Sequence, residues 1–191
     1  AYGIVQQLGR APDTVLIPCG GGAGMVAAHD AFREMFAAGV IDRMPRLVGV
    51  QLQACDPTAR AFHEGSDAVT PVDKKPSLSD AIMNNNPYWG RYCLQAVRET
   101  GGTMISVSDA DFIRTIRELG REEGLFTEPA GSVSVAALRY LVKVPGFENP
   151  GLTVCNLTGH GLNVPQVATD ESETPGVIPP TVEAVEAFLQ S

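Results

Sequence analysis

The residues best suited to chemistry are the glycines between Cys19 and Met25, where four of five positions carry no side chain. They follow an apolar run that begins at Thr14 and precede a stretch, Met25 to Ala38, whose apolar residues recur at helical spacing. A glycine loop at the start of a helix presents free N–H groups and the positive end of the helix dipole, and both suit a phosphate. The loop Gly20–Gly24 therefore predicts an anion site. The alternative is a tight turn between strand and helix that binds nothing.

A second glycine-rich turn, Thr158-Gly-His-Gly161, follows the apolar run Gly151 to Leu157. Thr158 offers a hydroxyl and His160 an imidazole. In an open parallel sheet, ligands bind outside the carboxyl ends of the strands. If the strands before the two turns are close in the sheet, both turns face one crevice. Otherwise Thr158 is an ordinary turn residue and His160 an ordinary surface histidine.

Two common phosphate-binding motifs do not fit the first loop. The dinucleotide fingerprint needs a third glycine and, about 20 residues later, an acidic residue. Met25 takes the place of that glycine, and the strand from Arg46 ends in Gln51 and Gln53 instead of an acid. The P-loop needs Gly-Lys-Ser/Thr after the glycines, and the sequence lacks it.

Metal binding is not predicted either. The cysteines and histidines are scattered, with no C-x-x-C pair and no spacing typical of zinc. We expect the cysteines to be reduced and mostly buried. These residues are Cys19, Cys55, Cys93, Cys155, His29, His63 and His160.

The elements that position these turns alternate between apolar strands and amphipathic helices, which predicts an α/β fold. We expect a largely parallel sheet with helices on both faces, a three-layer αβα arrangement. The predicted strands are 14–19, 46–52, 103–107 and 151–157. The predicted helices are 2–8, 25–38, 59–63, 88–100, 109–119, about 128–143 and 181–190. Ser108 and Asp111 form a predicted capping box, and 67–79 is a predicted exposed loop.

Composition limits the class of protein. The 191 residues carry a formal net charge of −8, which argues against nucleic-acid binding. No apolar run approaches the roughly 20 residues that span a bilayer, and no signal peptide is visible, so we expect a cytoplasmic protein. We divide the chain into an α/β domain, 1–164, and a proline-rich tail with a terminal helix, 165–191.

Several motifs together resemble a known family. In order they are the glycine loop GGGAG, PRLVGVQ, NNNPYWG, GLFTEPAGSVSVAAL and LTGHGL. The chain resembles the later half of the threonine synthases and their relatives, the pyridoxal-phosphate enzymes of the tryptophan synthase β-subunit fold (fold type II). The resemblance extends from about Ala1 to Pro165, and EPAGSVSVAAL and TGHGL are its most specific parts.

The resemblance implies pyridoxal 5′-phosphate as cofactor. The backbone N–H groups of Gly20, Gly21, Gly22, Ala23 and Gly24 would cradle the cofactor phosphate. Thr158 would hydrogen-bond the pyridine nitrogen, while Glu128 and the Asn86–Pro87 turn would lie near the cofactor. A neutral hydroxyl does not hold the ring nitrogen protonated as a carboxylate would, so the ring becomes a tempered electron sink.

Two departures from the family pattern bear on activity. The family's Schiff-base lysine lies in its earlier half, and this chain holds only Lys74, Lys75 and Lys143, none in a similar context. No catalytic residue is therefore predicted in this chain, and the lysine is expected upstream or in a partner chain. In addition, threonine synthases usually carry asparagines in the phosphate loop, whereas GGGAGM is nearer the dehydratase form.

The implied activity is that of a lyase acting on small amino acids, with O-phosphohomoserine plus water giving threonine and phosphate as the first choice. A related β-replacement or elimination enzyme, of the cysteate synthase or threonine dehydratase type, is the alternative. A non-catalytic module that binds a phosphorylated ligand or a partner protein is a second alternative. For the enzyme, we expect a complementary N-terminal half or partner subunit, and an oligomer.

Overall fold

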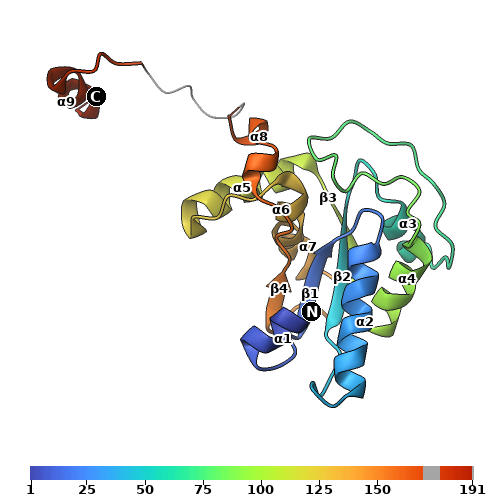
Figure 1. The fold of residues 1–191 in the computed structure, drawn as a ribbon. Helices are drawn as coiled ribbons and strands as arrows, with labels where there is room; N and C mark the ends of the chain where they lie inside the picture. Colours follow the sequence, from blue (N-terminus) through green and yellow to red (C-terminus); the bar gives the residue numbers. More distant parts are fainter. Residues whose placement is uncertain (170–176, 191) are drawn as a thin grey trace.

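The computed structural model describes residues 1–169 and 177–190. Its centre is a parallel sheet in the order β3-β2-β1-β4 (Figure 1). The strands are β1 (Thr14–Pro18), β2 (Arg46–Leu52), β3 (Thr103–Val107) and β4 (Thr153–Cys155). In the register, Thr14 of β1 lies opposite Arg46 of β2 and Thr153 of β4. The expected α/β fold with a parallel sheet is confirmed.

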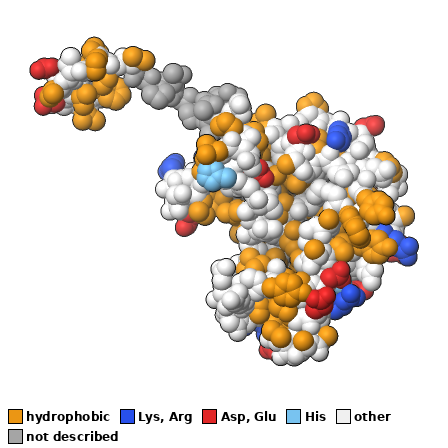
Figure 2. All heavy atoms as spheres, viewed as in Figure 1, with side chains coloured by type: hydrophobic (Ala, Val, Ile, Leu, Met, Phe, Trp, Pro, Cys, Tyr) orange, Lys and Arg blue, Asp and Glu red, His pale blue; other side chains and the backbone are white. Residues whose placement is uncertain are grey.

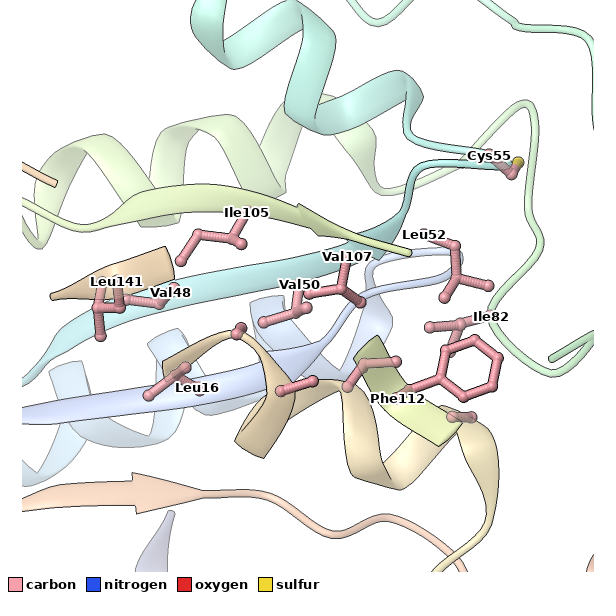
Figure 3. Close-up of a cluster of buried hydrophobic side chains, with 14 of the residues drawn as sticks. Leu16, Val48, Val50, Leu52, Cys55, Ile82, Ile105, Val107, Phe112 and Leu141 are labelled. Carbon is pink, nitrogen blue, oxygen red and sulfur yellow. The ribbon is translucent and has the colours of Figure 1, made fainter. Parts of the chain in front are cut away.

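Side chains alternate between the two faces of the sheet, because successive residues of a strand point to opposite sides. Leu16, Val48 and Val50 lie on one face and pack with Phe112 in the first core cluster (Figure 3). Val15, Ile17, Leu47 and Met104 lie on the other face, in a second cluster. Helices cover both faces, which gives the predicted three layers.

The helices divide between these faces. Those contributing to the second cluster are α1 (Tyr2–Leu8), α2 (Ala23–Ala37), α3 (Pro57–His63) and α4 (Gly90–Glu99). Those contributing to the first are α5 (Asp109–Glu118), α6 (Pro129–Ala136), α7 (Leu138–Leu141) and α8 (Gln166–Thr169), and α9 (Val182–Leu189) follows in the tail. A π-helical turn, Leu119–Glu123, extends α5, and a 3₁₀ turn, Gly161–Asn163, precedes α8.

The order of the strands reverses beside β1. From β1 the chain moves through β2 to β3 by way of α2, α3 and α4, and it returns through α5, α6 and α7 to β4 on the other side of β1. A reversal of this kind is a topological switch point, and ligands of open α/β sheets bind outside the carboxyl ends of the strands there. The fold thus places the switch point between the carboxyl ends of β1 and β4.

Two predicted elements differ from the structure, and one helix of the structure is additional. The strand expected over 151–157 is shortened to Thr153–Cys155, because its ladder with β1 covers these three residues and Gly151 before it turns with a φ of 71°. The helix expected over about 128–143 divides at Ala137, where the Tyr140 N–H donates to the Ala137 carbonyl three residues back. The helix α8 was not predicted.

The capping box at the start of α5 is confirmed. The Ser108 side chain accepts from the Asp111 N–H, and the Asp111 side chain accepts from the Ser108 N–H. The predicted loop also holds, since residues 66–89 contain neither helix nor strand. No helix among the described residues is long and apolar enough to cross a membrane.

Candidate functional site

The glycine loop joins the carboxyl end of β1 to the first turn of α2. Gly22 is the N-cap of α2, with a φ of 96°, and no side chain caps the helix. Within the described part of the chain, the N–H groups of Gly21, Gly22, Ala23 and Gly24 donate to no acceptor. Ala23 and Gly24 are exposed, so their donors are open to a ligand, whereas Gly21 is half-buried and Gly22 is buried. The loop therefore has the free donors and the helix dipole that an anion requires.

Close packing behind the loop explains two of its glycines. A β-carbon on Gly20 would lie 3.1 Å from the Ile82 Cα, and one on Gly22 would lie 2.4 Å from the Cys93 Sγ. The Cys93 thiol also donates to the Gly22 carbonyl at 3.4 Å and lies 3.9 Å from the Cys19 Sγ. The hydrogen bond with Cys93 and burial raise the pKa of the Cys19 thiol well above its usual value. Cys19 is thus a neutral packing group beneath the loop.

The turn Thr158–Gly161 follows β4, which pairs in parallel with β1. Thr158 is exposed, and its hydroxyl has no partner among the residues that the structure describes. The strands before the two glycine-rich turns are therefore neighbours. Both turns leave the same edge of the sheet, at the switch point.

The segment 126–131 packs against this turn through backbone hydrogen bonds and close contacts. The Glu128 N–H donates to the Gly159 carbonyl at 3.0 Å, and the Gly161 N–H donates to the Phe126 carbonyl at 2.9 Å. A β-carbon on Gly131 would lie 3.1 Å from the Thr158 nitrogen. The EPAG and TGHG motifs thus contact each other, although about 30 residues separate them in the sequence.

The Glu128 carboxylate lies against the backbone of Gly159, where a β-carbon would approach it to 2.2 Å. Its Oε2 accepts a hydrogen bond of 2.7 Å from the Asn163 side chain. Glu128 therefore has a fixed position beside the turn that carries Thr158. No pattern in the sequence pointed to Asn163, because the contact depends on the path of the chain after the turn.

His160 does not contribute its imidazole to the site. Its Nδ1 accepts from the Leu162 N–H at 3.2 Å, and its ring contacts Phe126 edge to face, with 5.6 Å between the ring centroids. The histidine caps the 3₁₀ turn and is exposed. It is the ordinary surface histidine of the alternative interpretation.

The loop between α3 and α4 approaches the glycines from a second direction. The Trp89 N–H donates to the Gly21 carbonyl at 3.1 Å. The Asn84 side chain lies beside Gly21, since its Nδ2 would be 3.1 Å from a β-carbon there. Of the expected Asn86–Pro87 turn, Asn86 is exposed and Pro87 is buried. Of the three asparagines in this run, Asn84 is the one whose side chain lies beside the glycines.

The other cysteines and the three lysines lie outside this site. All four cysteines are free thiols, Cys155 is half-buried, and burial raises its pKa to about 12. Lys74, Lys75 and Lys143 are exposed. Among the described residues, no group of three or more histidines, cysteines or acids could hold a metal ion.

A groove of about 580 Å³ leads away from the site between α1 and α2. Gly24 and Asn156 line it at the end near the two turns, and Ala27 and Ala28 line it along α2. Hydrophobic side chains are visible over α2 and α4 on this face (Figure 2). The large exposed ones at α4 are Tyr88, Trp89 and Tyr92, which contact one another in sequence order.

Comparisons with known proteins identify the family of this chain. The family model described as "Pyridoxal-phosphate dependent enzyme" matches residues 1–159. The threonine synthase of Methanosarcina acetivorans is 34% identical over 185 residues, which is 96% of this chain and 46% of that protein. The threonine synthase of Synechocystis is 36% identical over 174 residues, which is 90% of this chain and 42% of that protein. The chain thus spans about half the length of the curated relatives it matches.

Solved structures share the fold. A serine racemase from maize superimposes with a TM-score of 0.71 at 14% identity, covering 88% of this chain and 48% of that one. The processed form of threonine deaminase isoform 2 from Solanum lycopersicum gives a TM-score of 0.66 at 17% identity, covering 89% of this chain and 46% of that one. At such identities these likenesses support the fold alone.

Proposed function

This chain belongs to the pyridoxal-phosphate dependent enzymes, and we propose that it is the half of a threonine synthase-like lyase that binds the cofactor phosphate. One observation carries the proposal. The glycine loop and the Thr158 turn leave the carboxyl ends of two adjacent parallel strands, β1 and β4, at the point where the strand order reverses. One ligand with a phosphate at one end and a polar ring at the other suits such a pair of turns.

The residues present fit the cofactor. The free N–H groups of Gly21, Gly22, Ala23 and Gly24 would donate to the phosphate, and Gly20 allows the backbone to pass close to Ile82. The unpartnered Thr158 hydroxyl would donate to the ring nitrogen and leave it unprotonated. Glu128, held by Asn163, would lie beside that contact. When bound, pyridoxal phosphate supplies the electron sink for the chemistry of an amino-acid substrate.

The activity itself requires a residue that this chain does not offer. Lys74 and Lys75 are exposed and lie in the loop between α3 and α4. The Lys75 N–H donates a hydrogen bond to the carbonyl of Ala54, which follows β2. Lys143 lies over the Tyr140 ring, 6.0 Å from its centroid. We infer that the Schiff-base lysine comes from an upstream or partner segment and that this chain alone is inactive.

The groove between α1 and α2 supports the existence of such a segment. It is open, it is lined by small apolar residues such as Ala27 and Ala28, and it begins beside the proposed cofactor site. A contiguous apolar surface of this kind favours association. The complementary half would pack there and would bring the lysine to the crevice.

The first experiment measures cofactor binding by this chain. Pyridoxal 5′-phosphate is titrated while its absorbance and fluorescence are recorded, with inorganic phosphate as competitor. We expect saturable binding that phosphate weakens, and no borohydride-reducible link to any of the three lysines. A reducible link at Lys74, Lys75 or Lys143 together with turnover would overturn the split-site proposal. No saturable binding would overturn the cofactor role.

The second experiment fixes the reaction. The chain is combined with the complementary half and is given O-phosphohomoserine, O-phosphoserine or threonine, and the products are analysed. Release of phosphate with formation of threonine is the expected result. Products from phosphoserine or threonine alone would instead assign the cysteate synthase or threonine dehydratase type.

A further inference from the structure

The loop between α3 and α4 brings one amide side chain to the glycine loop. The contacts of this segment with the glycines are close, since the Trp89 N–H donates to the Gly21 carbonyl and the Ile82 backbone touches Gly20. Asn84 lies between Ile82 and Trp89 in the sequence. It is half-buried and belongs to no helix or strand.

The Asn84 amide has a defined orientation. Its Oδ1 accepts from the Asn86 N–H at 3.1 Å, and its Nδ2 lies 3.1 Å from the point where a β-carbon on Gly21 would be. The reversed amide would place an NH₂ donor against the Asn86 N–H, so the oxygen must face Asn86. In the described part of the chain, the Asn84 Nδ2 donates to no acceptor. A free NH₂ group therefore faces the glycine loop.

The glycine loop lacks side-chain donors of its own. From Cys19 to Met25 the sequence holds no serine, threonine, asparagine, lysine or arginine, so its polar groups are those of the backbone. A phosphate has three terminal oxygens and accepts several charge-assisted hydrogen bonds. Backbone donors from one side leave room for a donor that arrives from another segment.

We propose that Asn84 is a side-chain ligand of the phosphate, its NH₂ group donating to an oxygen held at Gly20–Gly24. The inference rests on the proposed cofactor role of the loop and adds a residue from a separate segment to the same site. It also explains Gly21, because a side chain at that position would stand where the amide approaches. The loop between α3 and α4 thereby becomes part of the phosphate site, and the ligand joins it to α2.

Asn84→Asp separates this role from a merely structural one. An aspartate keeps the oxygen that accepts from the Asn86 N–H, so it preserves the turn, but it replaces the NH₂ donor by a carboxylate oxygen. Asn84→Ala removes both. Asn85→Ala is the matched control, because Asn85 is exposed and its backbone carbonyl alone is bonded, accepting from the Val72 N–H.

The probes are pyridoxamine 5′-phosphate and pyridoxamine, which have no aldehyde and cannot react with the lysines. Calorimetry on the full chain at pH 7.5 and fixed salt measures both dissociation constants. We expect Asn84→Ala to weaken binding of the phosphorylated probe about tenfold to a hundredfold, as for loss of a hydrogen bond to a charged group. Asn84→Asp should weaken it further through repulsion, while Asn85→Ala should leave it unchanged. Binding of unphosphorylated pyridoxamine should change in none of the variants.

The remaining outcomes overturn the inference. If Asn84→Asp binds like the unsubstituted chain, Asn84 serves the turn and not the phosphate. If the variants weaken both probes equally, the effect is structural. If the unsubstituted chain does not prefer the phosphorylated probe, the proposed function of the loop itself fails, and that result is distinct from a failure of the Asn84 inference.

Discussion

At the scale of single residues, the site depends on polar groups that have no hydrogen-bond partner among the described residues. The Thr158 hydroxyl and the N–H groups of Gly21 to Gly24 are unpaired in the described part of the chain, whereas Glu128 and His160 have partners. Unpaired donors are costly when they are buried. Thr158, Ala23 and Gly24 are exposed, Gly21 is half-buried and Gly22 is buried. Substitution at Thr158, or at the exposed Ala23 and Gly24, should therefore change binding more than stability.

Thr158 tests this at the ring end of the cofactor. Thr158→Val keeps the shape but removes the hydroxyl, so we expect pyridoxamine 5′-phosphate to bind roughly threefold to tenfold more weakly, the effect of one neutral hydrogen bond. Thr158→Ser should bind as the unsubstituted chain does. Both variants should unfold at the same urea concentration as the parent. Equal binding by the valine variant would contradict the assigned contact.

Gly22 tests the support beneath the loop. Its φ is 96°, and a β-carbon there would lie 2.4 Å from the Cys93 Sγ, so the position has no space for a side chain. Gly22→Ala should therefore lower the free energy of unfolding by about 2–4 kcal/mol, through backbone strain and overpacking. Gly24→Ala is the control, because nothing lies within 4 Å of its β-carbon position, and its change should stay within about 1 kcal/mol. Urea denaturation gives both values, and equal values would refute the steric explanation.

At the scale of elements, the first three strands follow from the sequence within one residue, because each is a continuous apolar run buried on both faces. The fourth is shorter than its apolar run, because β4 pairs with β1 over three residues, whereas β3, at the other edge of the described sheet, pairs with β2 over five. The pairing of β4 with β1 could not be predicted from the sequence, since pairing between strands so far apart leaves no local signal. The direction of the Asn84 amide is equally invisible, because the Asn84-Asn-Asn86 run does not show which side chain faces the glycines.

The start of α5 gives a prediction for pH. Burial alone would raise the pKa of Asp111, but hydrogen bonds from Ser108 and Tyr140 and the charge of Arg114 outweigh it, and the pKa is lowered below 3.8. A carboxylate with a lowered folded pKa contributes stability above its unfolded pKa and loses it as the pH falls through the folded value. The free energy of unfolding should therefore drop between about pH 5 and pH 2.

In Asp111→Asn the free energy of unfolding should fall less between about pH 5 and pH 2. The variant should also be less stable at pH 7 by about 1–3 kcal/mol, the cost of disrupting a buried charged hydrogen-bond group. Tyr140→Phe, which removes the 2.6 Å bond to Asp111, should lie between the two. Urea titrations at each pH measure the difference. An unchanged pH slope in Asp111→Asn would rule out this network as its source.

At the scale of the whole molecule, the chain forms a layered α/β structure whose proposed site is open to a further segment. The groove between α1 and α2 and the exposed aromatic side chains of Tyr88, Trp89 and Tyr92 leave apolar surface on either side of the glycine loop. The chain also spans about half the length of its curated relatives. These features fit the proposed association with a complementary half.

A bulky residue in the groove tests that association. Ala27→Trp, at an exposed lining position of α2, should leave the stability of the chain unchanged within about 0.5 kcal/mol but weaken association with the complementary half at least tenfold. Ala37→Trp is the control, because it is exposed on the same helix and does not line the groove. Analytical ultracentrifugation of the mixed halves measures both. Equal weakening by the two substitutions would place the contact elsewhere.

The two turns of the site follow strands that differ in the free energy of their local unfolding. β1 shares five residue pairs with β2, whereas β4 shares three with β1 and has no second neighbour among the described strands. A short edge strand detaches at a lower free energy than a central one, so Thr158 is coupled to a local unfolding step that the glycine loop does not share. Binding pyridoxamine 5′-phosphate should therefore slow hydrogen exchange at the Asn156 amide, bonded to Leu16, and leave that of Cys19, bonded to Val50, unchanged. Equal slowing at both amides would show a stabilisation of the whole domain. The expected pattern would show that the bound cofactor stabilises the attachment of β4 to the rest of the sheet.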